Sequence, residues 1–303
     1  MAAHRGKLAV TGVGLDQLIT PRLPNSDAEE YQVAVGDWLL VDPASFQISR
    51  ILGRTSLFKR RAPGSGRALQ LIASNVDTAF IVASCNQDFN LARIERYLIL
   101  AREVGVQPIV VLTKQDLTDT PDRFVQAARS LQSGLEVAII DGRDPLSAGS
   151  LAGWCGVGET VALLGSSGVG KSTLINTLRG SQAIATRDVR ETDGKGRHTT
   201  TVREMHRLTH GGWLMDTPGM RELQLSDAAH GLADVFEDIL ALALRCKFSN
   251  CAHRSEPGCA VRSALNAGTL QADRLDRLRK LTAEDELNTL SLDKHRSKNR
   301  PTA

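Results

Sequence analysis

The segment from Val161 to Arg179 carries residue types and a spacing that suit a phosphate chain. A short apolar strand runs into a turn of small residues and then into a helix, the setting that a Walker A motif requires. Glycines allow backbone N–H groups to surround phosphate oxygens, and the helix N-terminus adds the positive end of its dipole. Lys171 can reach the β- and γ-phosphates, and the Ser172 hydroxyl can ligate Mg²⁺. We expect a nucleoside triphosphate to contact Gly165, Ser166, Ser167, Gly168, Val169, Gly170, Lys171, Ser172 and Thr173.

A second motif, Thr113-Lys114-Gln115-Asp116, directly follows an apolar segment at residues 108–112. The Asp116 carboxylate can accept hydrogen bonds from the ring N–H and the exocyclic amine of guanine, whereas adenine offers neither in that arrangement. The stem of Lys114 can lie along the face of the base. Such a tetrapeptide is weak evidence alone, but beside a phosphate-binding loop in the same sheet it indicates guanine.

A third motif, Asp216-Thr217-Pro218-Gly219, follows a predicted strand at residues 213–215. An aspartate at a strand end can hold Mg²⁺, usually through water, and the Gly219 N–H can sense the γ-phosphate. A polar loop at residues 194–201 precedes it, and one of its threonines can complete the Mg²⁺ shell. Together the three motifs are the parts of a GTPase.

The order of these motifs is unusual, because the guanine motif precedes the phosphate-binding loop. Ordinary GTPases place it after the aspartate motif. The same sheet is still possible in a circularly permuted chain, since a fold depends on its packed elements and tolerates new termini at surface loops.

A cluster of cysteines with one histidine lies near the C-terminus, with the spacing Cys-X4-Cys-X-His-X5-Cys. Three thiolates and an imidazole suit a closed tetrahedral structural Zn²⁺ site, although free thiols remain an alternative on spacing alone. The expected ligands are Cys246, Cys251, His253 and Cys259. Cys85 and Cys155 have no such company and are expected to be small core residues.

Alternating strands and helices must position these motifs. From residue 71 onward, strands are expected at 78–84, 108–112, 137–140, 161–164, 201–208 and 212–215, and helices at 91–104 and 122–131, besides the helix after the phosphate-binding loop. This alternation predicts a doubly wound α/β sheet. Residues up to about 62 read as short strands at 7–11, 16–23, 37–42 and 46–52, consistent with a small β-barrel, with a basic run at 59–61 and a linker at 63–66. After residue 227 the chain is predicted to be helical, and residues 284–303 read as a disordered basic tail.

The composition fits a soluble globular protein of more than one domain. The chain has 303 residues, of which 42% are hydrophobic and 23% charged, and its net charge is +3, so contact with nucleic acid would depend on local patches. Neither a membrane span nor a secretion signal is expected.

Further short segments in the same order make a resemblance explicit. These are Asn75-Val-Asp-Thr78, Asp88-Phe-Asn-Leu91 and Gly196-Arg-His-Thr-Thr200, together with the three motifs above and the Cys/His cluster. Over roughly residues 35–285 the chain resembles the family of ribosome small subunit-dependent GTPase A. The resemblance implies three domains: an oligonucleotide-binding (OB) barrel at 1–66, a permuted GTPase domain at 67–226 and a helical zinc domain at 227–303.

The resemblance also implies a function. The family acts late in maturation of the small (30S) ribosomal subunit, where ribosome binding stimulates hydrolysis of GTP to GDP and phosphate. For this chain it implies one zinc ion, Mg²⁺ with GTP, contact with ribosomal RNA, a cytoplasmic location and a monomer without a membrane partner. His198 is the expected catalytic residue, beside Lys171 and Thr200, because Met220 stands where Ras-like proteins carry a water-positioning glutamine.

Two departures from the family pattern bear on these expectations. The first strand of the barrel is expected either to be missing or to begin upstream of Met1. Ile139-Ile140-Asp141-Gly142 replaces the usual Ser-Ala segment beside the base, so that contact is placed only loosely. The rival readings are a P-loop phosphotransferase, a GTP-binding scaffold with little turnover, and a permuted GTPase acting on another RNA or the large subunit.

Overall fold

The structure is a computed structural model that describes residues 2–4, 7–12, 15–19, 32–61, 69–180, 203–216 and 224–298. The chain forms two compact units. The first comprises Met1–Ile94 and Val104–Leu223, and the second comprises Glu95–Glu103 and Gln224–Ala303.

The first unit is built on a mixed sheet with the strand order β10-β9-β8-β11-β13-β12-β1-β2-β3. The strands of its α/β part are β8 (Thr78–Ser84), β9 (Gln107–Thr113), β10 (Glu136–Ile139), β11 (Thr160–Leu164), β12 (Arg203–Arg207) and β13 (Trp213–Asp216). The five strands from β10 to β13 in this order are parallel, and β12 is antiparallel to β13. The predicted strands are therefore confirmed within the described residues, as is the α/β sheet.

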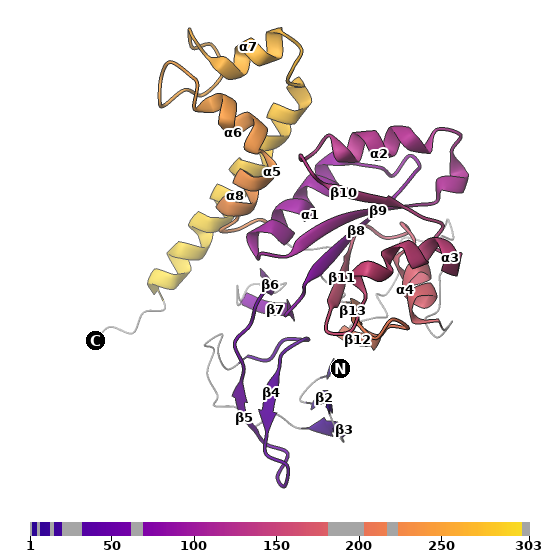
Figure 1. Cartoon of the computed structure of the whole chain (residues 1–303). Coiled ribbons are helices and arrows are strands. Elements are labelled where there is room, and N and C mark those ends of the chain that lie inside the picture. Colours follow the sequence, from indigo (N-terminus) through magenta and orange to yellow (C-terminus); the bar gives the residue numbers. More distant parts are fainter. Residues whose placement is uncertain are drawn as a thin grey trace, which may run out of the picture. The chain divides into compact units, whose positions relative to one another are not determined.

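Helices connect the parallel strands, as crossover connections require. They are α1 (Leu91–Glu103), α2 (Pro121–Arg129), α3 (Pro145–Ala148) and α4 (Lys171–Arg179), with 3₁₀ turns η2 (Gln115–Leu117) and η3 (Gly149–Trp154). Figure 1 shows α3 and α4 side by side against β11 and β13. Residues 91–94 of α1 belong to the first unit and residues 95–103 to the second.

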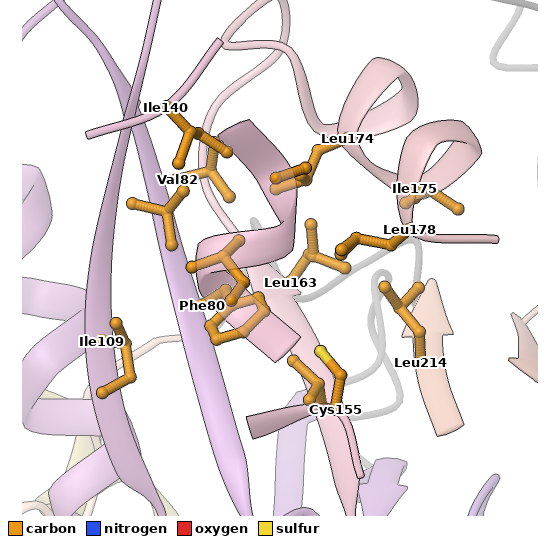
Figure 2. Close-up of a cluster of buried hydrophobic side chains, with 14 of the residues drawn as sticks. Phe80, Val82, Ile109, Ile140, Cys155, Leu163, Leu174, Ile175, Leu178 and Leu214 are labelled. Carbon is orange, nitrogen blue, oxygen red and sulfur yellow. The ribbon is translucent and has the colours of Figure 1, made fainter. Parts of the chain in front are cut away.

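The main core of the first unit lies between the parallel strands and α4. Phe80 and Val82 of β8 and Leu163 of β11 point into it, where they meet Leu174 and Leu178 of α4 (Figure 2). The intervening strand residues, such as Ile81, are equally buried and face the other side of the sheet. Strands covered on both faces read as continuous apolar runs, which is why the sequence predicts them well.

The N-terminal part of the first unit is rich in β-structure, as expected. It contains β1 (Ala2–His4), β2 (Lys7–Gly12), β3 (Leu15–Ile19), β4 (Leu39–Val41), β5 (Ile48–Ile51), β6 (Leu57–Arg61) and β7 (Leu69–Ser74). Val10, Ile19 and Ile48 share one small buried cluster, so strands of two different sheets pack around a common core. The expected linker at 63–66 lies outside the described residues.

The second unit is helical within the described residues. Its helices are α5 (Ala229–Val235), α6 (Glu237–Ala243), α7 (Ala260–Asn266) and α8 (Ala272–Lys298), beside residues 95–103 of α1. No helix in the described part of the chain combines the length and the apolar character that crossing a membrane requires.

The prediction of a disordered tail from residue 284 is wrong up to Lys298, because α8 continues through it. Two polar side chains near the start of this segment have partners. Glu284 forms an ion pair with Arg96, and the Asp285 carboxylate accepts a hydrogen bond from the Ala228 N–H. From composition alone, polar side chains are expected to be solvated, whereas these two contacts attach α8 to neighbouring segments of the second unit.

A buried carboxylate joins two helices of the second unit. The Glu95 side chain is fully buried, and it forms ion pairs with Arg274 and Arg277 of α8. Burial raises the pKa of Glu95, and the two guanidinium groups oppose that rise. Removing one partner from such a buried group leaves uncompensated charge, so this cluster favours one fixed packing of the two helices.

Candidate nucleotide and metal sites

The phosphate-binding loop joins β11 to α4, as the sequence predicts. Gly165 has φ +143°, and a Cβ atom there would lie 2.4 Å from the Val82 carbonyl oxygen. Gly170, with φ +97°, begins α4 from the left-handed region. Both positions require glycine, because side chains would clash or strain the backbone.

The Lys171 ammonium folds back over this loop. Its Nζ donates to the Gly165 carbonyl oxygen at 2.8 Å and also to the Ser166 carbonyl. Ser172 and Thr173, in the first turn of α4, are half-buried, while Ser167 and Gly168 are exposed at the tip of the loop. A cation, a helix N-terminus and a ring of backbone groups therefore converge on one place, an arrangement that binds phosphate.

Thr113 connects the guanine motif to the phosphate-binding loop. It ends β9 and is buried, and its hydroxyl donates to the Val169 carbonyl oxygen at 2.6 Å. Lys114 follows in the left-handed conformation, with φ 55°, which turns the chain sharply into η2. The two motifs, about fifty residues apart in sequence, thus share one edge of the sheet.

Asp116 lies in η2 and is well exposed, and its carboxylate contacts a residue that the sequence analysis did not identify. Arg143, in the loop after β10, places its Nη2 3.2 Å from Asp116 Oδ2. The same guanidinium is held by Asp141. Residues 139–142, which the resemblance placed only loosely beside the base, therefore lie next to the guanine motif.

Asp216 ends β13, the strand beside β11, and is half-buried. The carboxyl ends of β8, β9, β11 and β13 meet at the same edge, where ligands bind in open α/β sheets. The structure thus brings together the phosphate-binding loop, Thr113 to Asp116 and Asp216. Gly219, Met220, His198 and Thr200 lie outside the described residues, so their predicted roles stay predictions.

Arg93 is a second residue that the sequence analysis missed. Its Nη1 donates to the Ser166 hydroxyl at 2.6 Å, and its own N–H donates to the Asn90 side chain, which caps the start of α1. Arg93 and Ser166 are 73 positions apart. The neighbouring segment Asp88 to Leu91 is part of the family resemblance, but no local pattern of residues predicts the contact of Arg93 with Ser166.

Asn75, from another of the recognised segments, has a structural role. Its side-chain oxygen accepts from the Thr55 N–H at 2.9 Å, and its amide donates to the Gly36 carbonyl at 2.9 Å. Two residues on, the Asp77 carboxylate accepts from the Thr160 N–H. These bonds join the N-terminal strands to the start of β8 and β11.

The Cys/His cluster converges between α6 and α7 in the second unit. The four ligand atoms all lie within 4.8 Å of one another. Cys246 Sγ is 3.6 Å from His253 Nδ1 and 3.9 Å from Cys259 Sγ, and His253 Nδ1 is 3.4 Å from Cys259 Sγ. Bond lengths of about 2.0–2.3 Å around a tetrahedral Zn²⁺ place its ligand atoms roughly 3.5–3.8 Å apart. Cys246, Cys251, His253 and Cys259 could therefore hold a metal ion.

Backbone contacts shape the loop that carries these ligands. The Glu256 carboxylate accepts hydrogen bonds from its own N–H and from those of Ala252, Arg254 and Ser255, which lower its pKa to about 2. His253 adopts a left-handed conformation at φ 57°, and its carbonyl accepts from Arg279. These contacts fix the backbone of the loop that carries the four candidate ligands.

Cys85 and Cys155 are buried in the first unit, as predicted. Burial raises the pKa of Cys85 to about 11 and that of Cys155 to about 12. Both therefore stay protonated at neutral pH and behave as small core residues.

A phosphate-binding loop, a guanine motif that precedes it in sequence, and an aspartate on the neighbouring strand define the class: a circularly permuted P-loop GTPase. The model of the RsgA GTPase family matches residues 51–226. The chain belongs to the RsgA GTPase family, and it is an enzyme that hydrolyses GTP.

Relatives and solved structures agree with this assignment. The chain is 52% identical over 292 residues to "Small ribosomal subunit biogenesis GTPase RsgA" of Mesorhizobium japonicum, covering 94% of this chain and 82% of the relative. It is 47% identical over 302 residues to "Small ribosomal subunit biogenesis GTPase RsgA 2" of Vibrio parahaemolyticus, covering 99% and 82%.

The crystal structure of YjeQ from Thermotoga maritima has a similar fold, with a TM-score of 0.64 at 24% identity, covering 89% of this chain and 90% of that one. That of YloQ, described as a circularly permuted GTPase, has a TM-score of 0.60 at 24% identity, covering 90% and 88%. These likenesses concern the fold alone.

Proposed function

We propose that this GTPase binds the small ribosomal subunit and assists its late maturation, and that the subunit accelerates GTP hydrolysis. The observation that carries the proposal is the identity of 47–52% to relatives named for small-subunit biogenesis, which extends over 94–99% of the chain. Such extensive identity includes the parts outside the nucleotide site, with which a large partner would be recognised.

At the nucleotide site we assign roles by chemistry. Asp116 accepts the guanine N–H groups and Lys171 contacts the β- and γ-phosphates. Ser172 and Asp216 would hold Mg²⁺, and the ion would neutralise charge on the phosphates. Lys171 and Asp216 lie on neighbouring elements at one sheet edge, which supports this division. Thr200 and Gly219 would sense the γ-phosphate, and His198 would orient the attacking water.

At the Cys/His cluster we propose a single structural zinc ion. Three sulfur ligands and one imidazole favour Zn²⁺ over Mg²⁺ or Ca²⁺, which prefer oxygen. All four protein ligands come from one short loop, as in closed structural sites.

An exposed face of the N-terminal strands supports contact with ribosomal RNA. Trp38 is 65% exposed beside β4, and Leu40 and Arg50 are directly paired across β4 and β5. Directly paired residues project from the same face, and Trp38 precedes Leu40 by two positions, so it shares that face. An exposed aromatic ring with a neighbouring cation suits base stacking and phosphate contact.

We propose that the chain performs this function as a monomer in the cytoplasm, where ribosomal subunits are assembled.

The test is phosphate release from GTP by the full chain, alone and with purified small or large subunits. We expect slow turnover alone and strong acceleration by small subunits only. The Lys171→Ala variant is measured alongside, and its rate gives the background from any GTPase that copurifies with the ribosomal subunits. Equal acceleration by large subunits would favour another ribosomal target, and bound GTP without turnover under every condition would favour a scaffold.

A further inference from the structure

The loop after β10 presents a cation to the guanine motif. Arg143 Nη2 lies 3.0 Å from Asp141 Oδ2 and 3.2 Å from Asp116 Oδ2, so one guanidinium joins two carboxylates. We infer that Arg143 is a positioning residue for base recognition, which holds the Asp116 carboxylate in the orientation that accepts guanine. The inference rests on the proposed guanine role of Asp116.

Arg143 is itself held firmly. Its Nε donates to Asp141 Oδ1 at 3.0 Å while its Nη2 donates to Oδ2, a bidentate arrangement. The Arg143 backbone N–H also donates to Asp141 Oδ1 at 3.0 Å. Fork-like pairs of this type fix direction as well as distance. The Arg143 hydrogen bonds accordingly lower the pKa of Asp141 below its ordinary value.

The loop that carries this pair is anchored to both halves of the nucleotide site. The Thr177 hydroxyl of α4 donates to the Gly142 carbonyl oxygen at 2.6 Å. On the base side, the Ile140 N–H donates to the Leu112 carbonyl oxygen of β9 at 2.9 Å. Arg143 therefore has a defined position relative to the helix behind the phosphates and to the strand before the guanine motif.

The Asp116 carboxylate has capacity for both partners. Two carboxylate oxygens together accept up to about four hydrogen bonds, so the contact from Arg143 leaves room for two N–H donors of a base. Both side chains are exposed, at 64% for Arg143 and 43% for Asp116. Exposed ion pairs contribute little to folding, so the contact should matter chiefly once a base covers it and excludes water.

Nucleotide competition with the full chain tests the inference, with GDP, IDP and ADP displacing a fluorescent GDP analogue. IDP lacks the 2-amino group, so the ratio of GDP to IDP affinity reports whether Asp116 is aimed at both N–H donors. For Arg143→Ala we expect GDP affinity to fall roughly fivefold to tenfold, the weight of one ordinary hydrogen bond. The preference for GDP over IDP should shrink as well, and Arg143→Lys should restore part of it.

Arg129→Ala is the matched control, because it removes an exposed arginine from the end of α2 in the same unit. It should leave both affinities unchanged. Asp141→Asn, which weakens the bidentate hold without removing Arg143, should shift the GDP-to-IDP ratio in the same direction and supplies the test if Arg143→Ala fails to fold.

Three results would overturn the inference: unchanged GDP affinity in Arg143→Ala, equal losses for GDP and IDP, or tighter GDP binding, which would make Arg143 a competitor of the base. Equal affinity of the unmodified chain for GDP and ADP would instead remove the guanine assignment on which the inference rests.

Discussion

At the residue scale, one threonine links the two halves of the nucleotide site, the guanine motif and the phosphate-binding loop. The Thr113 hydroxyl donates to the Val169 carbonyl, so a direct hydrogen bond joins the end of the guanine strand to the phosphate-binding loop. A buried hydroxyl of this kind is costly to leave without a partner. Thr113 is therefore both the first residue of the guanine motif and a support for the phosphate-binding loop.

Asp116→Asn should change the base that the site prefers. The asparagine amide replaces an acceptor by a donor facing the guanine amine, and an unmet buried partner costs about 1–3 kcal/mol. We expect GDP affinity to fall at least about tenfold. Xanthine carries a carbonyl oxygen where guanine has that amine, so XDP affinity should rise in the variant.

Competition binding with GDP, XDP and ADP measures this change. Asp119→Asn, an exposed aspartate three residues further on, is the matched control and should leave the preference for GDP intact. A variant that still prefers GDP over XDP would contradict the role assigned to Asp116.

Residues in local motifs could be predicted, whereas those that join motifs could not. The phosphate-binding loop and the Thr113 to Asp116 segment are recognisable in the sequence, because their chemistry lies within a few neighbouring residues. Arg93 and Arg143 contact partners 73 and 27 positions away, respectively. Nothing in the residues around an exposed arginine distinguishes such a contact from a solvated charge.

At the element scale, burial decides how well the sequence predicts the structure. The strand β8 is buried along its whole length and was predicted with the bounds it has, Thr78–Ser84. The end of α8 was missed, because its stability comes from contacts such as Asn288 to the Leu225 carbonyl. Tertiary contacts override composition there.

The loop between α6 and α7 should depend on its metal. Purified protein should contain about one zinc per chain, the stoichiometry of one four-ligand site. In a Cys251→Ser, Cys259→Ser double variant the zinc should be lost. Residues 224–298 should then become sensitive to protease, because metal binding is coupled to folding, while GDP affinity stays close to that of the unmodified chain.

Metal analysis, limited proteolysis and GDP titration on the same samples measure the three effects. Cys85→Ala removes a thiol from the first unit and is the control for the loss of cysteine as such. Zinc content unchanged in the double variant would rule out the proposed ligands.

At the scale of the whole molecule, the permuted order of motifs is compatible with a single sheet that carries all three of them. Among the strands that carry the motifs, β8 and β9, at the base-recognition end, come first along the chain, and β11 with its phosphate-binding loop comes later. In the folded sheet β8 and β11 are nonetheless direct parallel neighbours. Spatial adjacency, rather than chain order, defines the site. Each motif is recognisable in the sequence by itself, because its chemistry lies within a few neighbouring residues.

The switch should require the partner. With Met220 in the position of a water-orienting glutamine, the free chain is expected to bind GTP but hydrolyse it slowly. A missing group supplied or ordered by a partner is worth roughly 10³–10⁵ in phosphoryl-transfer rate. We propose that the small subunit orders residues 194–201 so that His198 meets the attacking water.

His198→Ala should therefore lose most of the subunit-stimulated rate, while GTP affinity and subunit binding stay nearly intact. His210→Ala, which removes an exposed histidine from the turn between β12 and β13, is the matched control and should keep full stimulation. Lys171→Ala should fail earlier, at nucleotide binding, because it removes the charge that faces the phosphates. The measurements are single-turnover hydrolysis with and without small subunits, GTP titration and cosedimentation. Full stimulation of His198→Ala would assign the water-positioning role to another group. His198 is expected to act only on the rate of hydrolysis, after GTP and the small subunit have both bound.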